Sequence, residues 1–255
     1  MSWASRRRSA YLSGVGIFLA VVIGIPLAIW LYEAPTCFDG AQNQGETDID
    51  KGGPCIILDA RVLQPVSILW ARSFESRPSF YSAVAYIENI NKEAGIHAVG
   101  YRFGLYDSRN VLVAERTGTT FVMPGGITPV FEGAIETGNR DVVRTYFEFT
   151  EIPVWERMTN AADVIRITNN EMKDEATMPR LSATVRNTSV SDVVDPSFVA
   201  VVSDPAGNAF AASATTLQRL GAGEVGQVVF TWPTAFTSAV GRIDILPRLA
   251  PRTAR

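Results

Sequence analysis

The apolar residues of this 255-residue chain are arranged in two different patterns. Near the N-terminus, residues 9–32 run without a single charged side chain. From residue 56 onward, short apolar or alternating stretches such as YSAVAYIENI, HAVGYRFGLYD and SFVAVVSDPAGN are separated by Gly, Pro, Asn and Asp. The first pattern is typical of a membrane-spanning helix and the second of a sandwich or barrel of short strands. We therefore predict one N-terminal transmembrane helix followed by an all-β body.

The length of the apolar run supports a membrane span over residues 9–32. At 1.5 Å per residue, its 24 residues make about 36 Å of helix, enough to cross a hydrocarbon core of about 30 Å. Tyr11, Trp30 and Tyr32 lie near its ends, where aromatic rings favour the membrane interface. Residues 1–8 contain three consecutive arginines, which predicts that this basic tail stays in the cytoplasm and that the C-terminal body is extracytoplasmic.

A cleaved signal peptide is the alternative interpretation of this run. Its apolar region would be about 7–15 residues long and followed by a small-x-small cleavage site. The run is longer, and the sequence LYEAPTC that follows offers no such site, so we expect an uncleaved signal anchor. Small residues recur in it at every fourth position, which predicts close packing on another helix, although Gly and Ala are common in membrane helices anyway. These predicted helix-packing residues are Gly16, Ala20, Gly24 and Ala28.

The only two cysteines, Cys37 and Cys55, lie in one polar stretch directly after the apolar run. An oxidising compartment permits a disulfide between them, which would close the predicted loop or linker at residues 33–55. Such a closure contributes on the order of 3 kcal/mol. Carboxylates in the loop could hold Ca²⁺, but their order does not fit an EF-hand, so we expect a solvated loop with no metal or cofactor. These weak metal candidates are Asp39, Glu46, Asp48 and Asp50.

The same stretch resembles a short motif of extracytoplasmic proteins, C-x-D-G-x-x-N-x-x-E-x-x-x-D-C-G-G-x-C. Lys51 stands where that motif has a further cysteine, which leaves a single pair here. The positions that match are Cys37, Asp39, Gly40, Asn43, Glu46, Asp50, Gly52, Gly53 and Cys55.

The body reads as a repeat with an offset of 96 to 99 residues. AYIEN at residues 85–89 aligns with ATVRN at 183–187, and YRFGLYDSRN at 101–110 aligns with FVAVVSDPAGN at 198–208. Phe131 falls opposite Phe230. About 97 residues is the size of one immunoglobulin-like sandwich. We therefore predict two tandem immunoglobulin-like β-sandwich domains, with the parts divided as residues 56–152, linker 153–160, residues 161–249 and a frayed tail 250–255.

Within YRFGLYD, we expect Tyr101, Phe103 and Leu105 to share a core-facing side and Asp107 to begin a turn. The stretch FGLYD resembles the F-x-L-Y-D signature of small bacterial surface β-sandwich domains. That resemblance implies a fold and a surface location, with no activity attached. The first domain matches at Asn89, Phe103, Leu105, Tyr106, Asp107, Gly125 and Phe131, and the second, which lacks the aromatic pair, at Asn187, Val201, Asp204, Gly207, Gly223 and Phe230.

Charge and residue types narrow the function classes. After residue 32 the chain carries 20 basic and 26 acidic groups (23 minus 3, and 26), a poor surface for nucleic acid. His97 is the only histidine and no G-x-S-x-G elbow is present, so we expect no enzyme. Aromatic residues crowd residues 70–81 and are expected mostly in the core, with an interface as the alternative.

The sequence therefore predicts a structural or assembly protein of the cell envelope. Its expected partners are the lipid bilayer, other envelope proteins and a second copy of the chain. An adhesion or ligand-binding receptor, with calcium in one version, is the alternative.

Overall fold

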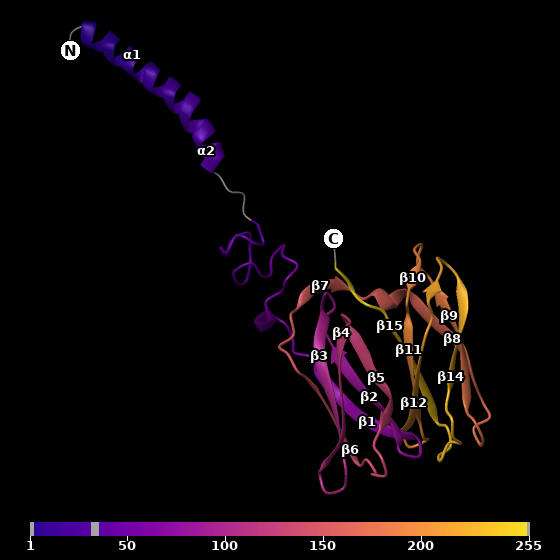
Figure 1. Cartoon of the computed structure of the whole chain (residues 1–255). Helices are drawn as coiled ribbons and strands as arrows, with labels where there is room; N and C mark the ends of the chain where they lie inside the picture. Colours follow the sequence, from indigo (N-terminus) through magenta and orange to yellow (C-terminus); the bar gives the residue numbers. More distant parts are fainter. Residues whose placement is uncertain (1–2, 32–35, 254–255) are drawn as a thin grey trace. The chain divides into compact units, whose positions relative to one another are not determined.

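The computed structural model describes residues 3–31 and 36–253 and divides into two compact units. The first unit, Met1–Pro54, contains the N-terminal helix and most of the cysteine loop. The second unit, Cys55–Arg255, contains all the strands (Figure 1). An all-β body with one N-terminal helix is therefore confirmed.

The N-terminal helix consists of α1 (Trp3–Leu19), a π-helical turn (Ala20–Gly24) and α2 (Ile25–Leu31). The π-turn ends two residues before Pro26, which has no N–H to donate and whose ring crowds the carbonyl four residues earlier, within the turn. Over Arg8–Leu27 the mean hydropathy is 2.2 and no part is buried, so the helix is long and apolar enough to span a membrane. Tyr32, the last residue of the predicted span, lies outside the described residues.

The strands β1 to β7 form what we call the first half of the body, in which every pairing is antiparallel. One sheet has the order β1-β2-β5, and in the other β3 pairs with β4, β6 and β7. The bounds are β1 (Ser67–Arg77), β2 (Phe80–Asn89), β3 (Ala94–Tyr106), β4 (Leu112–Val122), β5 (Gly126–Glu136), β6 (Arg144–Phe149) and β7 (Glu156–Thr159).

The strands β8 to β15 form the second half, with sheets in the order β14-β9-β8 and β12-β11-β15 and a short pair β10-β13. Short 3₁₀-helices span Ala60–Val62 and Ala161–Val164. The bounds are β8 (Ile165–Lys173), β9 (Arg180–Asn187), β10 (Val193–Val194), β11 (Ser197–Ser203), β12 (Ala209–Thr216), β13 (Arg219–Leu220), β14 (Val225–Thr231) and β15 (Arg242–Arg248).

The order of strand pairing in the first half recurs in the second. In the first, β2 lies between β1 and β5, while β3 lies between β4 and β6. In the second, β9 lies between β8 and β14, while β11 lies between β12 and β15. Taken in chain order, the strands therefore pair in the same way twice.

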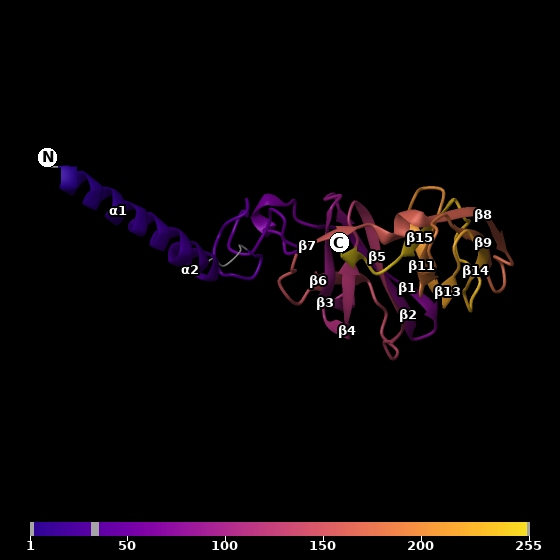
Figure 2. The same cartoon turned by 90° about the horizontal axis from the view of Figure 1, so that it is seen from above.

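The sheets stack in four layers, separated by three hydrophobic clusters (Figures 1 and 2). The first core lies inside the first half and includes Phe103 and Leu105. The second core lies inside the second half and includes Phe198 and Phe230. The third, which we call the middle cluster, joins the sheet β1-β2-β5 to the sheet β12-β11-β15. Its buried members are Phe74, Val84, Tyr86, Val199, Val201 and Ala212.

The middle strands β2 and β11 are buried on both faces for nearly their whole length. Their sequences, YSAVAYI and FVAVV, are continuous apolar runs where a half-exposed strand would alternate. The crowded aromatic residues divide accordingly: Tyr81 lies in the first core, while Trp70 and Phe74 belong to the middle cluster. Trp70 and Phe74 therefore pack where the two halves meet.

The predicted equivalence of Phe131 on β5 with Phe230 on β14 is wrong by one residue. Phe131 pairs with Val84 and contacts the middle cluster, whereas Phe230 pairs with Leu181 and lies in the second core. Ala83 and Leu181 each lie six residues before the buried asparagine that ends β2 or β9, and they pair with Glu132 and Phe230, so Glu132 takes the place of Phe230. A shift of one residue in a strand moves a side chain to the opposite face, so the two phenylalanines have different surroundings.

Two segments that we expected to be irregular contain strands. The predicted linker 153–160 includes β7, and Trp155 just before it is buried in the first core. In the predicted tail, β16 (Arg252–Thr253) pairs with β7 of the first half, and Leu249 is buried in the second core. Residues 252–253 therefore return to pair with the first half, which contradicts a frayed tail at these positions.

Candidate functional site

The predicted disulfide is present. Cys37 and Cys55 are disulfide-bonded, and Cys55 is buried. Within the loop, the backbone turns back at Asp48 and Lys51, which form an isolated antiparallel bridge. The structure of the loop therefore comes from this covalent closure and from polar contacts, because its sequence has few apolar side chains.

The acidic side chains of the loop bind its own backbone. Asp39 accepts hydrogen bonds from the N–H groups of Thr36 at 2.8 Å and Ala41 at 2.9 Å, and from the Asn43 amide at 2.9 Å. The bond from Thr36, followed by those from Asn43 and Ala41, lowers the pKa of the Asp39 carboxyl. Glu46, although only 6% exposed, accepts from the N–H of Asn43 at 3.2 Å.

The other two carboxylates of the loop, those of Asp48 and Asp50, also contact groups within the loop. Asp50 accepts from the N–H of Gly40 at 3.2 Å, and Asp48 lies 3.7 Å from the Lys51 ammonium. In the part of the chain that the structure describes, no three carboxylates come together as a metal site would require. Each of the four weak metal candidates therefore has a polar partner within the loop, and their role in metal binding stays a prediction.

The predicted helix-packing row stays a prediction. Gly16, Ala20 and Gly24 are exposed, and the row crosses the π-helical turn at Ala20–Gly24. The side chain of Ala28 lies outside the described residues.

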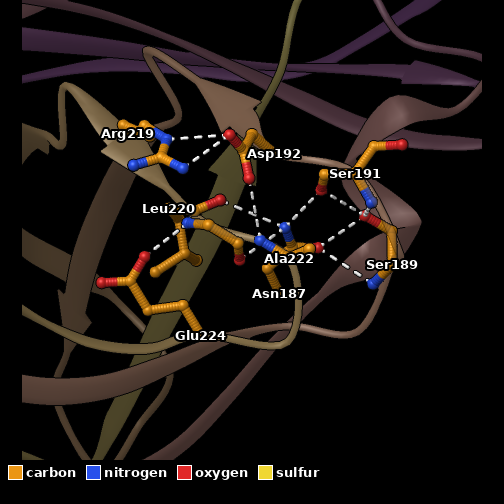
Figure 3. A network of polar contacts seen from close by, with 9 residues as sticks. Asn187, Ser189, Ser191, Asp192, Arg219, Leu220, Ala222 and Glu224 are labelled. Atoms are coloured by element: carbon orange, nitrogen blue, oxygen red, sulfur yellow. Dashed lines mark hydrogen bonds and ion pairs between the residues drawn. The ribbon is translucent and has the colours of Figure 1, made fainter.

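A buried asparagine organises the end of each half. Asn187 at the end of β9 is fully buried, and its amide donates to the carbonyls of Ser191 at 2.7 Å, Leu220 at 3.1 Å and Gly221 at 2.9 Å (Figure 3). Its carbonyl accepts from the backbone N–H of Ser189 at 2.9 Å. One side chain thereby connects β9 to two separate loops.

Around this network, Asp192 extends the contacts outward. Its carboxylate accepts from the Arg219 guanidinium at 2.7 Å and from the N–H of Ala222 at 3.0 Å (Figure 3). Arg219, more than Ala222, lowers the pKa of the Asp192 carboxyl. The network is therefore a rigid structural corner, since each of these polar groups already has a partner.

Asn89 makes the corresponding corner in the first half. It is fully buried and donates to the carbonyls of Ala94 at 2.7 Å and Met123 at 3.0 Å. Its carbonyl accepts from the N–H of Asn91 at 3.0 Å. The predicted correspondence of Asn89 with Asn187 thus extends to the same kind of hydrogen bonding.

The turns that follow β3 and β11 are also alike. The N–H of Asp107 donates to the carbonyl of Val111 at 3.0 Å, and the N–H of Asp204 donates to the carbonyl of Asn208 at 2.9 Å. Arg140 bonds to the Asp107 carboxylate at 2.8 Å and is the largest cause of its lowered pKa. The aspartate of FGLYD is therefore a turn residue.

A polar cluster crosses from one half to the other beside the middle cluster. The Tyr101 hydroxyl bonds to Glu132, and both burial and this contact raise the pKa of Tyr101. Arg248, from β15, donates to the Thr120 hydroxyl at 2.9 Å and stacks 4.8 Å from the Phe121 ring. Burial lowers the pKa of Arg248, although nearby Tyr101 opposes that effect. This cluster links β15 to β4.

Cavities open between segments of the two halves at the end of β2 and at the end of the middle cluster. The larger, about 610 Å³, opens at the end of β2 beside β7, and its charged lining residues are Glu88, Lys92, Glu93 and Asp163. The smaller, about 320 Å³, lies where the middle cluster ends between β1-β2-β5 and β12-β11-β15. Sequence reasoning missed both, because each is lined by residues far apart along the chain.

The smaller cavity contains the clearest unsatisfied group. The Tyr86 hydroxyl is buried and has no hydrogen-bond partner among the described residues. Burial raises the pKa of Tyr86, and Asp244 and Arg242 of β15 are the charges that act on it. The continuous apolar run of β2 was the available signal that Tyr86 faces a second sheet.

His97, the histidine weighed above for catalysis, lies on β3 with an exposed side chain.

Comparison with known proteins adds little to this geometry. No family model and no curated protein matches the chain. Among solved structures, a transglutaminase of red sea bream is 8% identical with a TM-score of 0.22, over 72% of this chain and 29% of its own. A β-glucuronidase of Bacteroides uniformis is 13% identical with a TM-score of 0.20, over 69% of this chain and 22% of its own. This chain therefore corresponds to under a third of either protein, and neither likeness bears on its fold or activity.

Proposed function

We propose that the chain is a single-pass membrane protein with a cytoplasmic N-terminus, whose extracytoplasmic β-sheet body acts as a structural or assembly component of the cell envelope. The observation that carries this proposal is the helix over Arg8–Leu27, none of which is buried. A helix that is apolar on all sides is stable only where lipid or other protein surrounds it. The bilayer is the partner that its length fits.

The disulfide supports an extracytoplasmic body. Bonds such as that of Cys37 and Cys55 persist in oxidising compartments and are rare in the cytosol. The arginines before the span favour the same orientation.

We further propose that the two halves are tandem immunoglobulin-like sandwiches of the F-x-L-Y-D type. The repeated order of strand pairing supports this, as do the matching corners at Asn89 and Asn187 and the matching turns at Asp107 and Asp204. Most buried polar groups in these features serve the fold, which favours a contact protein over an enzyme. The acidic body disfavours nucleic acid as a partner.

Fusions to the C-terminus test the orientation. We expect alkaline phosphatase to be active and green fluorescent protein to be dark when fused there, because the first needs an oxidising compartment and the second usually fails to fold when exported through it unfolded. A fusion lacking residues 9–32 is the control and reverses both signals. A fluorescent full-length fusion would refute the membrane topology.

Cross-linking in native membranes tests the assembly role. We expect the chain to be recovered with itself or with other envelope proteins, and the double variant Gly16→Ile, Gly24→Ile to lose any contact made by the helix. Val15→Ile with Val22→Ile, on other faces of the helix, is the matched control. Recovery of only monomer under all conditions would argue against assembly.

An adhesion or ligand-binding receptor is the second candidate, and the two cavities of the body favour it. If the receptor depends on calcium, added Ca²⁺ should raise the unfolding temperature of the protein. An unchanged temperature would rule out that dependence, as the inward contacts of Asp39 and Glu46 lead us to expect.

A further inference from the structure

The middle cluster is apolar along most of its length but ends in a polar cavity. On β11, the residues facing the first half run from Val199 through Val201 to Ser203. Val201 and Ser203 pair across the sheet with Asp244 and Arg242 of β15. The interface therefore changes from aliphatic to charged within two residues of each strand, and a cavity of about 320 Å³ opens there.

The first half supplies an aromatic wall to this cavity. Trp70 and Tyr86 are paired across β1 and β2, and their ring centroids are 4.2 Å apart. The Arg72 guanidinium lies 5.8 Å from the Trp70 ring and also lines the cavity. The two rings are tilted by 36° to each other, and the Arg72 guanidinium lies over the Trp70 ring, so this wall is aromatic and carries a positive charge.

Both strands that frame the cavity are irregular at this point. The pairing of β1 with β2 shifts between Ile68 and Trp70, and that of β11 with β12 shifts between Val202 and Ser203. Such bulges redirect side chains and are over-represented next to binding and active sites.

The Tyr86 hydroxyl is the second, independent observation. Tyr86 is 7% exposed, and its hydroxyl has no hydrogen-bond partner among the described residues. A buried hydroxyl without a partner is costly and rare in folded proteins, so such a group beside a cavity indicates a missing partner. Asp244 and Arg242, the two charged residues that act on the pKa of Tyr86, also line this cavity.

We propose that this cavity is a binding site for a small planar organic anion, such as an aromatic carboxylate. Its ring lies beside Trp70 and Tyr86, its carboxylate is held by Arg72 with Arg242 next to it, and a polar group of the ligand satisfies the Tyr86 hydroxyl. Arg242 and Asp244 form an ion pair at 2.8 Å, so the net positive charge of the lining comes from Arg72, and this charge favours an anion. The volume is at the lower end of ligand pockets, which limits the ligand to roughly one or two rings.

Titration calorimetry on the full chain in detergent micelles, with 4-hydroxybenzoate as the probe, tests this site. We expect saturable binding, weakened at least about ten-fold by Arg242→Gln or Arg72→Gln, as the loss of a charge-assisted hydrogen bond implies. Arg166→Gln, an exposed arginine on β8, removes the same charge elsewhere and should leave binding unchanged. The neutral 4-hydroxybenzamide should bind about ten-fold more weakly than the acid.

Tyr86→Phe supplies a readout that separates a ligand site from an empty interface. It keeps the ring but removes the hydroxyl, so it should raise the unfolding temperature of the free protein while weakening binding of the probe. The proposal is overturned if the probe does not bind at millimolar concentration. It is equally overturned if the amide binds as well as the acid, or if Arg242→Gln and Arg166→Gln bind alike.

Discussion

The packing of the two halves against each other can be tested at Phe74. This residue lies on β1, is 8% exposed and belongs to the middle cluster. Replacing a buried phenylalanine by alanine costs about 3–5 kcal/mol, from lost burial and from the cavity left behind. If the two halves stood apart in solution, Phe74 would lie on an open face of its sheet. Phe74→Ala would then cost under about 0.5 kcal/mol.

The chain contains suitable reporters for the assay. Trp70, Trp155 and Trp232 belong to the middle cluster, the first core and the second core respectively. With Trp3 and Trp30 of the helix replaced by phenylalanine, denaturant unfolding of the full chain in micelles can be followed by fluorescence and circular dichroism. We expect a single transition that all probes report at the same denaturant concentration.

Phe103→Ala is the matched control, because Phe103 is fully buried in the first core whether or not the two halves pack against each other. Both variants should lose about 3–5 kcal/mol. A loss of several kcal/mol from Phe103→Ala, with almost none from Phe74→Ala, would refute a shared middle cluster. An early change confined to Trp70 in single-tryptophan variants would do the same.

Three further predictions concern the polar features. Asn187→Ala should lower the free energy of unfolding by roughly 3 kcal/mol, since three buried carbonyls lose their donor, as denaturant titration would measure. Replacing Cys37 and Cys55 by serine should remove about 3 kcal/mol of loop closure and make the loop, but not the strands, cleavable by protease. The pKa of Asp107 lies below its unfolded value of 3.8, so its contribution to stability is present above that pH and is lost as the pH falls through the lower folded value. Asp107→Asn should therefore make acid unfolding depend less steeply on pH, and an unchanged slope would contradict this.

The features predicted correctly depend on residues close together in the chain. The helix follows from an uncharged run, and the turn at Asp107 follows from the polar residues beside it. The correspondence of Asn89 with Asn187 was also visible, because the same short pattern recurs at an offset that stays between 96 and 99 residues. Phe131 and Phe230 were mismatched, because alignment of letters does not register a shift of one residue relative to the partner strand.

The sequence by itself determined the elements of this protein: one apolar helix, a disulfide loop, and a body of short strands whose pattern recurs. Only the tertiary structure decided which faces meet, and so where Tyr86 opposes Val201 and where a cavity opens beside them. The physical reason is that a strand's own residues specify which of its faces are apolar. On β2, the residues that cover the face of Val84 and Tyr86 come from β11, more than a hundred positions away. Hydrophobic burial is not directional, so the apolar pattern of β2 does not specify which sheet covers that face.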